Sequence, residues 1–160
     1  MGAISARPAS PRTSPLGSSG AAIVAGLVAA NAFSRAGLSN DALLNLATEI
    51  EGHPDNVAAS LFGGLVLSTT LEDRIVALSY RYPKPLAVVL FYPRILISTH
   101  ESRKLLPKTV TFEEAIFNLG RAAHLAAAFS TGRLEEVPFA FEDRLHQERR
   151  SVQMPYLFDA

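Results

Sequence analysis

The most informative absence in this 160-residue sequence is cysteine, which does not occur at all. Without a thiol, the chain can form no disulfide, no thiolate nucleophile and no zinc–thiolate site. An excess of charge of one sign is also lacking, because fifteen basic and fifteen acidic residues cancel. Bulk charge therefore gives no reason to expect nucleic acid or an anionic membrane surface as a partner.

Long apolar runs are lacking as well. The most apolar stretch, residues 21–33, is too short to span a bilayer and contains Gly26 and Asn31. With 48% hydrophobic and 19% charged residues, the composition is typical of a globular chain. Together with the absence of cysteine, this favours a cytoplasmic protein without a membrane partner.

The pattern of apolar residues predicts an α+β chain, in which helices are followed by antiparallel strands and then by further helices. The first helix should be capped by Ser18 or Ser19, run to about Arg35 and be buried, because it is apolar on nearly every side. The second should start after residue 39 or 40 and end at Gly52. Its apolar residues at helical spacing should form the buried stripe: Leu43, Leu46, Ala47 and Ile50.

The middle of the chain is rich in Val, Ile, Leu and aromatic residues, which favour strands. Three strands are predicted, over residues 64–68, 74–80 and 86–92. Thr111 followed three residues later by Glu114 is typical of a capping box and predicts a helix over residues 112–130. A last helix is predicted over residues 135–149. A shift in composition over residues 93–107 is a candidate boundary between two lobes.

A loop rich in Gly and Ser precedes the first predicted helix. Gly17 and Gly20 let the backbone approach a ligand closely, and the unpaired N–H groups of the first helical turn attract anions. A hydroxyl of Ser18 or Ser19 could contact a phosphate or Mg²⁺. The same residues also suit an ordinary capped helix with small side chains for close packing. The spacing of a Walker loop and its lysine are absent.

Five polar side chains crowd into the turn after the second predicted helix: Glu49, Glu51, His53, Asp55 and Asn56. They are compatible with a charged helix terminus followed by an Asx turn. A His-x-Asp pair can also bind a metal, but without another histidine close by it would be a poor zinc site. Taken alone, this turn does not decide between a structural and a functional role.

Together, the two motifs resemble those of the superfamily of galactose, homoserine, mevalonate and phosphomevalonate kinases. The segments EGHPDNVA (51–58) and GGLVL (63–67) are similar to the homoserine kinase branch in particular. Three further segments continue this similarity: STHESRKLLP (98–107), NLGRAA (118–123) and EDRLHQ (142–147). Pro15 departs from the pattern, since the family has glycine there and proline removes an N–H group.

The resemblance implies part of a two-lobed small-molecule kinase fold, with further family residues expected on both sides. We expect a disordered or non-native start, the C-terminal part of the ATP-binding lobe and the beginning of the C-terminal lobe, over residues 1–14, 15–82 and 83–160. It also implies ATP and Mg²⁺ as cofactors. The substrate would be L-homoserine, phosphorylated on its side-chain hydroxyl on the way to threonine.

The resemblance also assigns residues to the nucleotide and its metal. The ATP phosphates would lie on the loop formed by Leu16, Gly17, Ser18, Ser19, Gly20 and Ala21. Ser19 and Glu51 would be the Mg²⁺ ligands, with Glu49 as the substitute for Glu51. Mg²⁺ would bridge phosphate oxygens and offset the charge that develops during phosphoryl transfer.

For the substrate, the resemblance implies two residues with catalytic roles, Arg103 and Asp55. A planar guanidinium suits the homoserine carboxylate, and a carboxylate suits its ammonium group. His53, Asn56 and Thr99 would line the pocket. Arg149 would add a second contact to the carboxylate. Whether Asp55 also acts as a general base stays open.

Two other readings remain. The chain could be an inactive remnant that binds at most a nucleotide or a partner, because unpaired strand edges favour association. It could also be a sister kinase for another small alcohol. A homodimer is compatible with each reading.

Overall fold

The computed structural model describes residues 17–89 and 104–152. Its contacts divide the chain into two compact units, Met1–Arg81 and Tyr82–Ala160. Three of the predicted site residues lie outside the described residues: Leu16, Thr99 and Arg103. Within the described ranges, no helix is long and apolar enough to cross a membrane.

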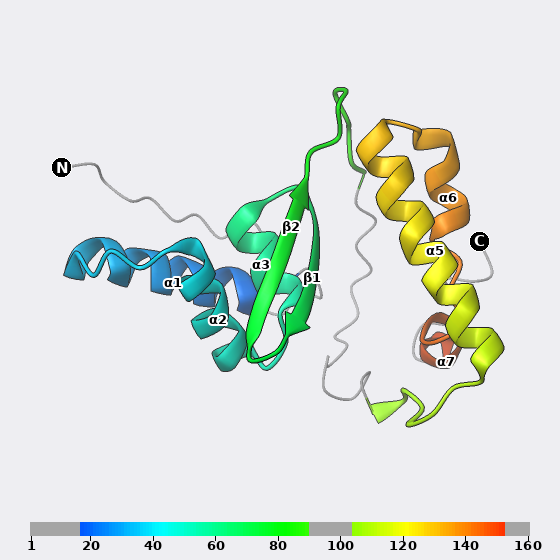
Figure 1. Cartoon of the computed structure of the whole chain (residues 1–160), viewed down its shortest axis with the longest axis horizontal. Helices are drawn as coiled ribbons and strands as arrows, with labels where there is room; N and C mark the ends of the chain where they lie inside the picture. Colours follow the sequence, from blue (N-terminus) through cyan, green and yellow to red (C-terminus); the bar gives the residue numbers. More distant parts are fainter. Residues whose placement is uncertain (1–16, 90–103, 153–160) are drawn as a thin grey trace. The chain divides into compact units, whose positions relative to one another are not determined.

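The first unit places three helices against one side of a β-hairpin (Figure 1). Its elements are α1 (Ser18–Ser34), α2 (Asn40–Glu51), α3 (Asp55–Phe62), β1 (Leu65–Leu71) and β2 (Arg74–Tyr80). The strands pair antiparallel, from Leu65 opposite Tyr80 to Leu71 opposite Arg74. Helices followed by antiparallel strands confirm the predicted order of this half of the α+β chain.

An apolar core joins the helices of this unit. Leu44 of α2 and Val57 of α3 are fully buried, and Val24 of α1 packs with them. Alternate residues of the hairpin, Val66 and Ile75 among them, cover this core from one side. Burial of apolar side chains at the helical and strand periods is therefore what holds the unit together.

Helix α1 differs from its prediction in two ways. Its N-cap is Gly17, in the left-handed conformation with φ +73°, and no side chain caps the helix. Its burial is also limited, because Gly20 and Val24 are buried while Phe33 is 81% exposed. Within the described residues, α1 packs mainly against α2 and α3, and apolar residues such as Phe33 stay exposed.

Helix α2 starts as predicted, since Ser39 is its N-cap and accepts the N–H of Ala42 at 3.2 Å. The predicted stripe was wrong in part, because Leu46 and Ile50 are exposed. The buried residues are Leu43, Leu44 and Ala47, and the last two belong to the core.

Helix α3 was not predicted, since its first residues were read as a turn. Asp55 lies in its first turn, where a carboxylate is favourable to the helix dipole. Val57 and Ala58 then follow as fully buried residues. Turn-forming residues thus begin a helix here because two small apolar residues behind them enter the core.

The second unit contains one long helix with short helices beside it (Figure 1). Its elements are α5 (Phe112–Thr131), the 3₁₀ helix η1 (Leu134–Glu136), α6 (Val137–Ala140) and α7 (Gln147–Ser151). The capping box at the start of α5 is confirmed. The N–H of Glu114 donates to Thr111 Oγ1 at 3.2 Å, and the N–H of Thr111 donates to Glu114 Oε2 at 2.8 Å.

Two predictions for the second unit were wrong. The continuous helix over 135–149 is broken into three pieces, because Pro138 lacks an N–H group and the Asp143 carboxylate takes the N–H groups of His146 and Gln147. The predicted strand over 86–92 is absent from residues 86–89, and its last three residues lie outside the described ranges.

Candidate phosphate and metal site

The Gly/Ser loop and the acidic turn meet at one end of the first unit. Ser19, in the first turn of α1, donates its Oγ–H to Glu51 Oε1 at 2.7 Å. Ser19 is exposed, and the Glu51 side chain is 9% exposed. Two oxygen-bearing side chains that lie 32 residues apart in sequence are therefore in contact beside the start of α1.

His53 extends this pair toward the start of α3. Its Nε2 lies 3.9 Å from Glu51 Oε1, and its Nδ1 hydrogen-bonds Asp55 Oδ1. Asp55 Oδ1 also accepts the N–H of Asn56 at 2.7 Å, and its side chain is 64% exposed. Four predicted residues thus form a continuous series of contacts: Ser19, Glu51, His53 and Asp55.

Glycines allow α1 and α3 to approach closely at this point. A Cβ on Gly17 would lie 3.1 Å from Asn56 Cγ, and the φ of +73° there disfavours any other residue. A Cβ on Gly20 would lie 3.2 Å from Asn56 Cβ and 3.3 Å from the Val57 nitrogen. Asn56, predicted to line the substrate pocket, therefore packs against the predicted phosphate loop.

The Ser19–Glu51 pair fits the requirements of Mg²⁺. This ion prefers octahedral oxygen ligands at 2.0–2.1 Å, so neighbouring ligand oxygens lie about 2.9 Å apart. The observed separation of 2.7 Å is that of an O–H···O hydrogen bond, and it places both oxygens within reach of one ion. Residues 17–89 and 104–152 contain no group of three or more His, Asp or Glu placed to hold a metal. An ion here would therefore need further oxygens from a bound phosphate or water.

Glu49, the predicted substitute for Glu51 as a metal ligand, is exposed on α2.

The start of α1 also suits a negatively charged group. Its first turn contains no acidic residue, and its N-cap residue, Gly17, has no side chain that could cap the N–H groups. These groups and the helix dipole favour an anion such as phosphate. Seen together, the first unit offers N–H donors for a phosphate and two oxygens for a cation within the same small area.

The remaining predicted residue, Arg149, lies on α7 in the second unit. Its Nη2 donates to Glu114 Oε1 at 3.1 Å. Hydrogen bonds from the backbone and side chain of Thr111 outweigh desolvation, with help from Arg149, and hold the pKa of Glu114 below its ordinary value. One carboxylate thus caps α5 with one oxygen and holds Arg149 with the other.

A second network in this unit was missed by the sequence analysis, which quoted its segments without giving them a role. Asn118 Nδ2 donates to Asp143 Oδ2 at 2.6 Å. Burial raises the pKa of Asp143, but hydrogen bonds from Gln147, His146 and Asn118 outweigh it and hold the pKa below its ordinary value. No standard capping pattern marks this role, because the N-cap of α7 is His146 and Asp143 lies three residues before it.

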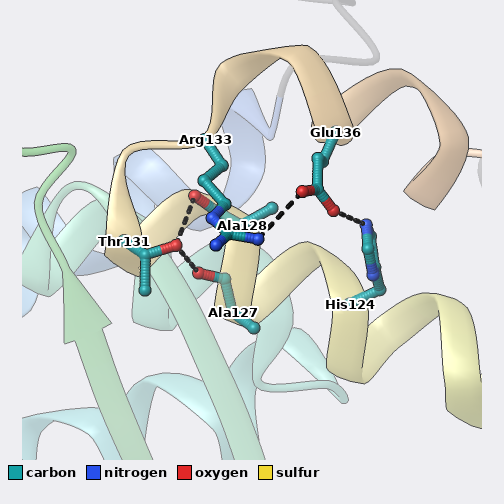
Figure 2. A pocket seen from close by; sticks show the side chains of 6 residues that line it. All are labelled: His124, Ala127, Ala128, Thr131, Arg133 and Glu136. Atoms are coloured by element: carbon teal, nitrogen blue, oxygen red, sulfur yellow. Dashed lines mark hydrogen bonds and ion pairs between the residues drawn. The ribbon is translucent and has the colours of Figure 1, made fainter.

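The second unit also contains a pocket of about 280 Å³ at the end of α5 (Figure 2). His124 Nε2 lies 2.9 Å from Glu136 Oε2, and Arg133 Nη1 lies 3.0 Å from Glu136 Oε1. The rest of the lining is formed by Ala127, Ala128 and Thr131. Its charged groups pair with one another, and none of its residues belongs to the predicted site.

Comparison with known proteins places this geometry in a class. Residues 4–64 match the model of the GHMP kinases N terminal domain, and this range includes the loop, the acidic turn and all of α1 to α3. The match begins inside residues 1–14, which were expected to be a disordered or non-native start. The chain is therefore similar to this domain across its candidate site.

Within that class, the relatives are homoserine kinases. The homoserine kinase of Carboxydothermus hydrogenoformans is 46% identical over 88% of this chain and 46% of the relative. That of Caldicellulosiruptor saccharolyticus is 40% identical over 91% of this chain and 47% of the relative. The crystal structure of homoserine kinase from Cytophaga hutchinsonii matches 94% of this chain and 50% of its own, with 25% identity and a TM-score of 0.78.

The chain is thus homologous to homoserine kinases over most of its length, and it spans about half the length of these relatives. Its helices and two-stranded antiparallel sheet form part of the GHMP kinase fold.

Proposed function

We propose that the protein is an ATP-dependent homoserine kinase, which phosphorylates the side-chain hydroxyl of L-homoserine in the cytoplasm as a step toward threonine. The observation that carries the proposal is the contact between Ser19 and Glu51 at the start of α1. The names of the relatives support homoserine as the acceptor.

In this proposal, the N–H groups at the start of α1 hold the ATP phosphates, and Ser19 and Glu51 hold Mg²⁺. The bound ion would neutralise charge on the transferring phosphoryl group. The 2.7 Å separation of the two oxygens supports Glu51 over Glu49 as the carboxylate ligand. Gly17 and Gly20 keep α1 close enough to Asn56 for the loop and the acidic turn to act on the same ligand.

The acidic turn and the arginines would bind homoserine. Asp55 would accept the substrate ammonium, since its side chain is 64% exposed and His53 contacts one of its carboxylate oxygens. Arg103 and Arg149 would bind the carboxylate, with Thr99 beside them. Binding of both charged ends would place the substrate hydroxyl toward the phosphates, which is the main contribution that a kinase makes.

A coupled assay of ADP release tests this proposal. Purified protein is incubated with MgATP and homoserine, serine or mevalonate in turn. We expect ADP release to depend on homoserine and to be at least tenfold faster than with serine or mevalonate at equal concentration. Serine carries its hydroxyl one carbon closer to the charged groups, and mevalonate lacks the ammonium group.

Each other outcome has a defined meaning. Preference for mevalonate or serine would contradict homoserine as the acceptor and favour a sister kinase. Binding of ATP without turnover of any of the three alcohols would contradict the proposed activity and favour an inactive relative that retains nucleotide binding.

A further inference from the structure

Asn118 and Asp143 form a hydrogen-bonded clamp between α5 and the start of α7. Asn118 Nδ2 donates to Asp143 Oδ2 at 2.6 Å, and Asn118 Oδ1 accepts the N–H of Arg144 at 3.0 Å. The other oxygen, Asp143 Oδ1, accepts the N–H groups of His146 at 2.5 Å and of Gln147 at 2.8 Å. The two carboxylate oxygens thus tie one helix to the first turn of the other.

The clamp is well suited to fix the position of α7 relative to α5. The Asp143 side chain is 10% exposed, so water competes little for its hydrogen bonds. Asn118 makes two bonds in a fixed plane, and Asp143 makes three in all. A five-residue helix such as α7 has little stability of its own, so its position depends on contacts of this kind.

Helix α7 contains Arg149, six positions after Asp143. Its guanidinium is held from one side by Glu114, and its side chain remains 36% exposed. A guanidinium has five N–H donors. Arg149 Nε is buried and Nη2 donates to Glu114, so the donors left for a ligand are on the two Nη atoms. Clamp and ion pair together leave Arg149 little freedom of position.

We propose that Asp143, held by Asn118, is a positioning residue that sets Arg149 for the carboxylate of the amino-acid substrate. This inference rests on the proposed function, in which Arg149 contacts that carboxylate. Asp143 itself does not touch the substrate, and it acts through the position of α7.

Exchange of the two side chains gives a sharp test. In Asp143→Asn, two amide NH₂ groups face each other, or an NH₂ group faces the N–H groups of His146 and Gln147. In Asn118→Asp, two carboxylates face each other. In the double variant Asn118→Asp with Asp143→Asn, all four hydrogen bonds can form again, with donor and acceptor exchanged in the bond between the two side chains and the three backbone N–H groups still donating. Glu142→Gln, beside the clamp but outside it, is the matched control.

Steady-state kinetics are measured at a temperature where circular dichroism shows each variant to be folded. For Asp143→Asn we expect the KM for homoserine to rise roughly tenfold, with kcat and the KM for ATP changed less than twofold. The exchanged double variant should return the KM for homoserine to within about threefold of the unaltered protein. Glu142→Gln should leave all three constants unchanged.

Two results would overturn the inference. One is an unaltered KM for homoserine in Asp143→Asn. The other is a loss that affects kcat and both KM values alike and that the exchange does not rescue, which is the pattern of a purely structural role. Absence of homoserine-dependent turnover in the unaltered protein would instead refute the proposed function, and the positioning role with it.

Discussion

Each of the two units is stabilised internally by a different kind of interaction. In the first unit, buried apolar side chains from three helices form one core that includes Leu44 and Val57. In the described part of the second unit, the buried hydrophobic residues are two alanines, Ala128 and Ala140. There, side-chain hydrogen bonds and ion pairs connect the helices, as between Asn118 and Asp143.

This difference indicates which polar groups are free for chemistry. Because the core of the first unit already joins its helices, we propose that the contact between Ser19 and Glu51 serves a shared ligand. In the second unit, Glu114 and Asp143 already complete helix starts. Their carboxylates therefore serve structure first, and any functional role is indirect.

The largest expected effect concerns the apolar core of the first unit. Leu44→Ala should lower the free energy of unfolding by about 3 kcal/mol, because the side chain is fully buried and its removal leaves a cavity. Leu46→Ala on the same helix is the matched control, and its side chain is 38% exposed. It should cost less than about 1 kcal/mol. Urea unfolding measures both. Equal losses would contradict a core centred on Leu44.

A smaller and pH-dependent effect on stability is expected from Asp143 in the second unit. At pH 6, Asp143→Asn should lower stability by about 2 kcal/mol, because two N–H groups lose their charged acceptor. The folded pKa of Asp143 lies below its ordinary value of 3.8. Its contribution is therefore complete above pH 3.8 and is lost as pH falls through the folded value.

The stability difference between the unaltered protein and Asp143→Asn should consequently shrink in strong acid. Unfolding by urea at pH 6 and at pH 2.5, followed by hydrogen exchange at α7 amides, measures it. A difference that stays constant over this range would show that the charge on Asp143 does not stabilise the unit.

Much of the fold could be predicted from local signals. These signals act within a few residues of chain: Ser39, the capping box at Thr111 and Glu114, and the mainly apolar residues of 74–80. Predictions failed where distant contacts decide. The side of α1 that is buried depends on α2 and α3. The turn before α7, which Asp143 forms, is also held by Asn118 of the distant helix α5.

The candidate site was likewise predictable only in part. Sequence similarity placed the Gly/Ser loop and the acidic turn in one nucleotide site, and the structure brings Ser19 to Glu51. The packing of Asn56 on Gly17 and Gly20 could not be predicted, because it depends on the close approach of two helices. The predicted roles of Thr99 and Arg103 stay predictions, since these residues lie outside the described ranges.

The most direct test of the account is the Mg²⁺ dependence of ATP binding, measured by isothermal titration calorimetry with Mg²⁺ and with EDTA. We expect the unaltered protein and the control Glu49→Gln to bind ATP at least tenfold more tightly with Mg²⁺. Glu51→Gln should lose this difference while it still binds ATP weakly in EDTA. Retention of the full Mg²⁺ effect by Glu51→Gln would contradict a metal site at Ser19 and Glu51.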